Sequence, residues 1–297
     1  MTRHTSPVTA FGVAAGGIAV YAAMDAIMKG LSIAHGAYAA VLWRSVAGVV
    51  LLGPVFLARR KAWPTRAALR LHGARGVIAG GSVLLFFWGL VRVPMAQGVA
   101  LTFLAPLIAL FLAGLTLGER IRRAAIGGSL VASLGVLAIA AGQVQARASE
   151  DMVLGSVAII LASILYAGSL ILLRRQAQVA DPLEVALFTS IVLSALLLIG
   201  APWFASVPDA SDLPAIAAAA LLGSVSAVAL AWAYARAEAQ VLAPVEYTAF
   251  VWSALLGWLV FAERVSPYTV AGALLIIAGC LVAVRKPAPG PQIEVAQ

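Results

Sequence analysis

The feature that most constrains this chain is the recurrence of apolar runs too long to form the core of a soluble domain. A helix needs about 20 consecutive apolar residues to cross a hydrocarbon layer of about 30 Å. Residues 101–117 and 153–173 are apolar on all sides, not along a single stripe. Hydrophobic residues make up 63% of the chain and charged residues only 11%, against about 25% charged in soluble domains. Lipid is therefore the expected solvent for most of the chain.

The apolar runs predict an all-α polytopic membrane protein with ten transmembrane helices. Barrel strands are excluded, because they alternate apolar and polar residues over about 10 positions. Little chain remains for loops, so no separate soluble domain is expected. The spans are expected at about residues 11–29, 37–57, 73–92, 94–117, 124–142, 154–173, 183–204, 213–235, 243–261 and 267–284.

The basic residues predict the orientation. With the N-terminus in the cytoplasm, fifteen Lys or Arg residues fall in cytoplasmic segments and four in outer segments. Because short cytoplasmic loops are enriched in Lys and Arg, both termini are predicted to be cytoplasmic. The net charge of +8 comes largely from these basic residues beside the apolar runs. They form no continuous stripe with aromatic or polar side chains that could read nucleic-acid bases. No nucleic-acid partner is expected.

The chain also repeats itself at an offset of about 144 residues. Residues 117–121 (LGERI) align with 261–265 (FAERV), and further matches follow at nearly the same offset. The further matches are Gly128 with Gly272, Gly135 with Gly279, Trp88 with Trp232, Arg92 with Arg236, Tyr21 with Tyr166 and Lys29 with Arg174.

This repeat divides the chain into residues 1–142 and residues 143–297, with five spans in each part. Because five is odd, the second part must enter the membrane from the side opposite to the first. Inverted repeats of this kind place a binding site near the bilayer midplane and allow two states that open to opposite sides. The repeat therefore predicts a transporter.

These features resemble the EamA branch of the drug/metabolite transporter superfamily, and within it the bacterial amino-acid exporters of the YddG kind. The most specific elements are Glu119 and Glu263, which close spans four and nine, and Arg44 within span two. Phe188, the repeat mate of Arg44, departs from the arginine of the family. The resemblance implies an exporter of amino acids or related small amphipathic metabolites, without a cofactor, in the bacterial inner membrane.

Charged side chains inside spans are candidates for the substrate pathway, because each costs at least ~2.5 kcal/mol near the membrane centre unless paired or hydrated. Asp25 lies about five residues from the outer end of span one, and Arg44 about seven residues into span two. They could meet the ammonium and carboxylate groups of a zwitterion, or Asp25 could exchange protons. Alternatively, an Asp25–Arg44 or Asp25–Lys29 ion pair only orients the helices.

Aromatic, polar and proline residues near mid-membrane complete the predicted site. Tyr21 and Tyr166 lie about 16 to 18 Å deep and either line the pathway or join neighbouring helices. Trp252 with Tyr247 either forms an apolar wall for the substrate or packs in the core, and Glu246 faces either the cavity or cytoplasmic water. The predicted pathway is Tyr21, Asp25, Arg44, Trp88, Gln97, Thr102, Tyr166, Tyr247 and Trp252, with hinges at Pro106 and Pro244.

The remaining polar residues carry weaker predictions. Glu119 and Glu263 are expected to pair with loop arginines at the ends of their helices. His35 and His72 are expected in loops, and Cys280 has no second cysteine with which to form a disulfide or bind a metal.

Other classes of protein fit less well. No Walker loop, H-E-x-x-H or G-x-S-x-G motif occurs, so no enzyme is expected. Without an ATP-binding motif, uphill transport is expected to draw on an ion or solute gradient. A cationic-drug exporter is the nearest alternative, but it would concentrate more midplane carboxylates than Asp25 and Glu246. A monomer is expected, because a duplicated chain supplies its own two-fold partner.

Overall fold

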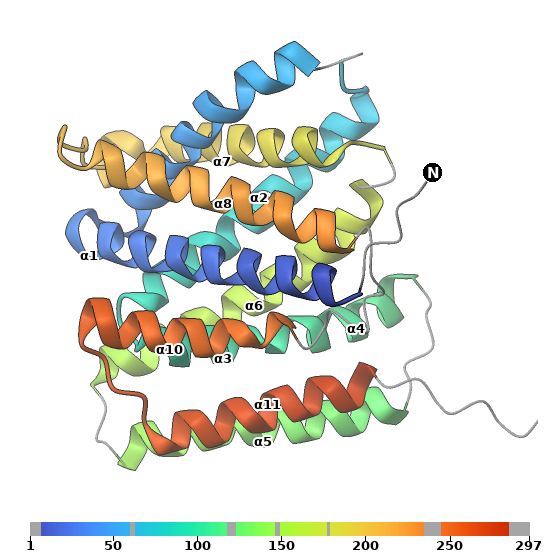
Figure 1. The fold of residues 1–297 in the computed structure, drawn as a ribbon, viewed down its shortest axis with the longest axis vertical. Helices are drawn as coiled ribbons and strands as arrows, with labels where there is room; N and C mark the ends of the chain where they lie inside the picture. Colours follow the sequence, from blue (N-terminus) through green and yellow to red (C-terminus); the bar gives the residue numbers. More distant parts are fainter. Residues whose placement is uncertain are drawn as a thin grey trace, which may run out of the picture.

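The computed structural model describes residues 7–59, 63–117, 123–145, 149–176, 179–234 and 245–284, and these residues contain helices and no strand. Figure 1 shows the helices packed side by side, with α5 and α11 paired along one edge. The helices are α1 (Pro7–Arg59), α2 (Arg66–Leu90), α3 (Met95–Thr102), α4 (Leu104–Leu117), α5 (Arg123–Gln145), α6 (Glu150–Gln176), α7 (Pro182–Phe204), α8 (Leu213–Tyr234), α10 (Thr248–Phe261) and α11 (Pro267–Val284).

Six of the described helices are long and apolar enough to cross a membrane, namely α1, α2, α5, α6, α7 and α8. Shorter apolar helices cover Met95–Ala109, Thr248–Phe261 and Pro267–Val282. The all-helical fold expected from the apolar runs is confirmed for the described residues, and the architecture is that of a polytopic membrane protein.

Helix α1 consists of two helices that meet at Gly36. The backbone of Gly36 has φ 82° and ψ 150°, a conformation that L side chains rarely adopt. We expected the first span to end near residue 29 and a short loop to follow; this was wrong, because helix continues to residue 35. Asp25 therefore lies eleven residues from the turn, about 16 Å along the helix, and is deeper than predicted.

Two further helices are interrupted at equivalent places. A turn at Phe103 separates α3 from α4, and a turn at Tyr247 precedes α10, although each region was predicted as one span. Phe103 and Tyr247 are 144 residues apart and thus repeat mates. Pro106 accounts for the first interruption, because a proline ring clashes with the carbonyl four residues earlier, here that of Thr102. Pro244 lies outside the described residues.

The repeat seen in the sequence recurs in the contacts between helices. The Ser82 hydroxyl donates to the Ala162 carbonyl at 2.8 Å, and the Ser226 hydroxyl donates to the Gly17 carbonyl at 2.8 Å. Shifting one pair along the sequence by 144 or 145 residues gives the other pair. Helices α2 and α6 are thus joined in the same way as α8 and α1.

Helices α5 and α11 approach so closely that only glycine fits between them. A Cβ atom at Gly135 would lie 2.5 Å from the Gly272 carbonyl oxygen, and one at Gly272 would lie 2.5 Å from the Gly135 carbonyl oxygen. Small residues allow such backbone contact where lipid provides no hydrophobic force between helices. The two halves of the sequence are therefore held together along this edge by main-chain packing.

Candidate functional site

A cavity of about 320 Å³ lies among α1, α2, α3, α4, α6, α8 and α10 and is lined by both halves of the sequence. This volume is at the lower end of the range for small-molecule pockets, about 300 to 1,000 Å³. The apolar part of the wall consists mainly of phenylalanine and small apolar side chains. The polar and charged lining residues are Tyr21, Asp25, Arg44, Ser82, Thr102, Ser163, Tyr166, Glu246, Tyr247 and Ser253.

The cavity brings together most of the residues predicted for the pathway. Six of the nine, together with one predicted hinge, line it: Tyr21, Asp25, Arg44, Thr102, Tyr166, Tyr247 and Pro106. These residues come from segments up to 226 positions apart, so the fold assembles the cavity from sites that the sequence places far from one another.

The other three predicted pathway residues contact protein groups elsewhere. The Arg92 guanidinium lies 3.5 Å from the centre of the Trp88 ring. Gln97 is buried and donates to the Ser156 hydroxyl at 3.0 Å. Trp252 packs against an apolar cluster of α1 and α8. Their structural surroundings are therefore helix packing and not the cavity lining.

Asp25 and Arg44 face the cavity without neutralising each other by direct contact. Asp25 is 5% exposed, and its Oδ1 atom and the Arg44 Nε atom are buried without a hydrogen-bond partner. Among the described residues, no ion pair joins the two side chains. Gly223 on α8 makes room for the arginine, because a Cβ atom there would lie 2.9 Å from Arg44 Nη2. Both side chains thus line the cavity while part of their hydrogen-bonding capacity is unused.

Tyr21 and Tyr166 occupy equivalent places in the cavity. Their exposed fractions are 46% and 47%, and this exposure is toward the cavity that both residues line. In the lining of the same cavity, the rings of Phe103 and Tyr247 meet edge to face with centroids 5.2 Å apart and planes at 89°. The two helix interruptions therefore meet at the cavity and present aromatic rings to it.

An ion pair closes the bundle at the end where α10 terminates. Lys29 is 2% exposed, pairs with Glu263 and donates to the Val93 carbonyl at 2.8 Å. A carboxylate oxygen of Glu263 accepts from the Met95 amide at 2.7 Å. We expected Glu263 to pair with a loop arginine; this was wrong, because its partner is Lys29. The alternative ion pair between Asp25 and Lys29 does not form. Glu119, the counterpart of Glu263, lies outside the described residues.

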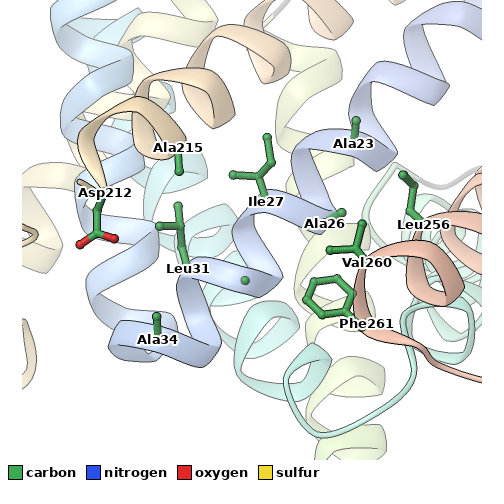
Figure 2. Close-up of a pocket in the computed structure, with 11 residues that line it drawn as sticks. Ala23, Ala26, Ile27, Leu31, Ala34, Asp212, Ala215, Leu256, Val260 and Phe261 are labelled. Atoms are coloured by element: carbon green, nitrogen blue, oxygen red, sulfur yellow. The ribbon is translucent and has the colours of Figure 1, made fainter. Parts of the chain in front are cut away.

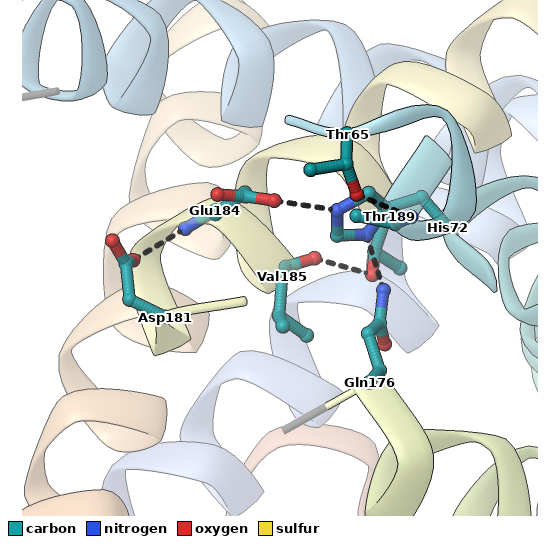
Figure 3. A network of polar contacts seen from close by, with 8 residues as sticks. Thr65, His72, Gln176, Asp181, Glu184, Val185 and Thr189 are labelled. Carbon is teal, nitrogen blue, oxygen red and sulfur yellow. Dashed lines mark hydrogen bonds and ion pairs between the residues drawn. The ribbon is translucent and has the colours of Figure 1, made fainter. Parts of the chain in front are cut away.

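A buried polar network joins α2, α6 and α7 (Figure 3). His72 contacts Glu184 at 2.9 Å and Gln176 through its other ring nitrogen, and its ring stacks on Phe188. We expected His72 in a loop; this was wrong, because α2 begins at Arg66, where the Thr65 hydroxyl accepts from the Ala68 amide. A threonine followed by three helix-compatible residues was the available signal.

A second hollow, of about 500 Å³, lies between α1, the start of α8 and α10 (Figure 2). Its lining is apolar apart from Asp212, which lies 2.9 Å from His35 Nε2. A site that orients a polar solute needs several convergent polar groups. The cavity around Asp25 and Arg44 meets that requirement and this groove does not. Within the described residues, no cluster of His, Cys, Asp and Glu is arranged to hold a metal ion.

The sequence matches the model of the EamA-like transporter family twice, over residues 9–141 and over residues 153–285. The chain belongs to the EamA-like transporter family. The resemblance inferred from the sequence is thereby confirmed, and this EamA-like protein is a multi-pass membrane transporter of small molecules and not an enzyme.

Several named proteins are similar to this EamA-like transporter over most of its length. The pseudopaline exporter CntI of Pseudomonas aeruginosa is 27% identical over 88% of this chain and 90% of its own. A probable terminal-alkyne amino-acid exporter of Streptantibioticus cattleyicolor is 30% identical over 82% of this chain and 80% of its own. A riboflavin transporter of Brucella anthropi is 26% identical, with coverages of 82% and 86%.

The fold of this EamA-like transporter is also found among solved structures. One crystal structure superposes with a TM-score of 0.60 at 22% identity and covers 94% of this chain and 98% of the other. The general fold is thus shared with a protein of distant sequence.

Proposed function

We propose that this EamA-like transporter exports amino acids or related small amphipathic metabolites across the bacterial inner membrane. The observation that carries the proposal is the cavity, which combines aromatic walls with the unpaired charges of Asp25 and Arg44. A zwitterion placed there would give its carboxylate to Arg44 and its ammonium group to Asp25, and an apolar side chain would contact the rings. Such a solute supplies the hydrogen bonds without which buried charges are costly.

We further propose that the transporter alternates access through an inverted repeat, with ten spans, both termini in the cytoplasm, and repeats at residues 1–142 and 143–297. The equivalent serine contacts and the two separate matches to the family support this architecture. The repeat mates of Lys29 and Glu263 are Arg174 and Glu119, which carry the same signs of charge. Residues for an equivalent ion pair are therefore present in the other repeat, for the state in which the opposite end closes.

The names of the relatives support export of amino-acid-like cargo. Two of them are called exporters, and one of these two is called an amino-acid exporter. The sequence contains no nucleotide-binding loop, so an ion or solute gradient would supply the energy for uphill export. We expect a monomer, since the two repeats provide one complete cavity.

Release from preloaded proteoliposomes tests the proposed cargo. Vesicles containing the full chain should release labelled amino acids faster than protein-free vesicles. Asp25→Asn and Arg44→Gln should each slow release about tenfold, the effect of losing one charged hydrogen bond. Glu150→Gln, at the exposed start of α6, is the matched control and should behave as wild type. Release of a cationic dye but of no amino acid would assign the cavity to cationic drugs instead.

A further inference from the structure

The apolar groove of about 500 Å³ lies on the side of α1 that faces away from the central cavity. Ala23, Gly30 and Ala34 line the groove, whereas Tyr21 and Asp25 of the same helix line the cavity. At about 3.6 residues per turn, these two sets of residues lie on opposite sides of the helix. Because the cavity lies among the helices of the bundle, the groove opens outward, where lipid is the expected solvent.

The groove is about as long as one leaflet of a membrane is thick. Its two ends on α1, Ala23 and Ala34, are eleven residues apart, which is about 16 Å along the helix. One leaflet supplies half of a hydrocarbon layer of about 30 Å. Ala34 lies two residues before the turn at Gly36, so the groove begins near the membrane edge and extends toward the midplane.

Small side chains leave this groove unfilled by the described part of the protein. A Cβ atom added at Gly30, in the floor of the groove, would meet nothing within 4 Å. Figure 2 shows Val260 and Phe261 of α10 on one side of α1 and Ala215 of α8 on the other. The walls therefore present hydrocarbon groups, which suit an acyl chain and not a polar solute.

One carboxylate lies at the membrane edge of the groove. Asp212 directly precedes α8, lines the groove and has a side chain that is 23% exposed. It contacts the ring of His35, the residue after Ala34, and accepts from the Asp209 amide. Both of these contacts use Oδ2, which leaves Oδ1 for a donor from outside the protein. A carboxylate at the end of an apolar groove is complementary to a lipid whose head group is an ammonium ion.

We propose that this groove binds one acyl chain of a phospholipid with a primary ammonium head group, such as phosphatidylethanolamine, and that Asp212 accepts from the ammonium group. An acyl chain gains little by leaving lipid for an equally apolar groove, so the head group decides which lipid is held. A hydrogen bond between two charged groups is about twice as strong as one between neutral groups. The bound lipid would pack against α1, α8 and α10 without entering the cavity.

Lipid retention tests this site directly. The full chain in detergent is mixed with phosphatidylethanolamine or with phosphatidylcholine of the same acyl chains, and native mass spectrometry measures the lipid retained. Phosphatidylethanolamine should bind at one copy per chain. It should bind about tenfold more tightly than phosphatidylcholine, whose trimethylammonium group has no N–H to donate. It should also raise the Tm more than phosphatidylcholine does.

Two pairs of variants locate the acyl chain and the head group. Gly30→Leu should abolish retention, because leucine occupies the open space in the groove. Gly12→Leu on the same helix also meets nothing within 4 Å but lies outside the groove, and it should retain lipid as wild type does. Asp212→Asn should lose the tenfold preference between the two lipids, whereas Asp209→Asn, exposed in the same connection, should keep it.

Each of the other outcomes would overturn part or all of the proposal. Equal retention by Gly30→Leu and Gly12→Leu would show that lipid does not occupy the groove. Equal affinity of the wild type for both lipids would exclude recognition of the ammonium group, even if Asp212→Asn does not fold. A wild-type dimer that Gly30→Leu converts to a monomer would assign the groove to a second copy of the chain. None of these measurements depends on cargo release, so their failure would leave the proposed function standing.

Discussion

Several side chains in this bundle place a charge in a region where lipid is the expected solvent. Their contacts determine how much free energy each buried charge costs. Lys29 is compensated by a carboxylate and a carbonyl oxygen. Asp25 and Arg44, by contrast, each keep a buried atom without a hydrogen-bond partner. The contacts thus separate a charge that the protein itself compensates from two charges whose hydrogen bonding is incomplete. The identity of the amino acids alone does not reveal this difference.

Ala262 is a residue whose backbone conformation does not suit its side chain. It follows α10 with φ 53° and ψ 27°, a left-handed conformation that costs a non-glycine residue about 1 to 2 kcal/mol. The position allows the Glu263 amide to bond the Gly257 carbonyl at 3.0 Å and thus places Glu263 beside Lys29. The first repeat has Gly118 at the equivalent position.

We predict that Ala262→Gly stabilises the protein by about 1 kcal/mol, because glycine adopts this conformation without the steric cost. Thermal melts in detergent micelles should show a higher Tm. Ala271→Gly in the exposed part of α11 is the matched control and should lower the Tm, because glycine is unfavourable within a helix. An unchanged or lower Tm for Ala262→Gly would show that the left-handed residue carries no strain.

At the scale of helices, the contacts that join segments distant in sequence determine how the bundle is closed. Lys29 and Glu263 are 234 residues apart and connect α1, the start of α3 and the end of α10. Removing one member of a buried pair leaves the other charge uncompensated.

We therefore predict that Glu263→Gln destabilises the bundle by roughly 3 kcal/mol, because it leaves Lys29 buried without a counter-charge. The double variant Lys29→Met with Glu263→Gln should regain a large part of this loss. Thermal melts of the two single variants and the double variant measure the coupling between the side chains. Arg264→Gln at the exposed neighbouring position controls for charge removal near the same turn. Additive losses would mean that the pair contributes no coupling.

Close packing of α5 on α11 gives a second prediction for helix contacts. Gly135→Ala places a Cβ atom against the Gly272 carbonyl and Ile276, and so should separate the helices and lower stability by about 1 to 3 kcal/mol. Gly127→Ala on the same helix has nothing within 4 Å of the added atom and should be tolerated or stabilising. Detergent stability of the two variants distinguishes them, and equal losses would argue against the contact.

The helix interruptions show why periodicity alone located elements better than it located their ends. The apolar runs predicted one helix through residues 94–117, but the chain turns at Phe103. Pro106 was the local signal for that turn. The turn at Tyr247 occurs at the equivalent position, and the sequence signals for it were the repeat and the hinge predicted at Pro244. Between the first two predicted spans, by contrast, we expected a loop, but residues 30–35 remain helical and only Gly36 is non-helical.

For the whole molecule, the proposed inverted repeat makes a prediction about topology. Five spans per repeat place both termini on the same side, and the excess of Lys and Arg places that side in the cytoplasm. Cytoplasmic reporter fusions at the N-terminus and at the C-terminus should both be active, and a fusion in the 205–212 connection should report the opposite face. Termini on opposite faces would contradict ten spans and the cavity argument that depends on them.

The sequence alone determined the solvent, the helical class, the repeat and the family. These depend on the length of apolar runs and on matches along the chain, both of which can be read without knowing which segments touch. It also identified Asp25, Arg44, Tyr21 and Tyr166, because charge and hydroxyl groups are conspicuous within apolar runs.

Only the tertiary structure decided which of these groups meet. It paired Lys29 with Glu263, placed Trp88 and Gln97 away from the cavity lining, buried His72 between three helices and joined Arg75 to Thr189. The physical reason is that a contact depends on distances set by the packing of whole helices. Residues hundreds of positions apart become neighbours through that packing, and no local pattern records the result.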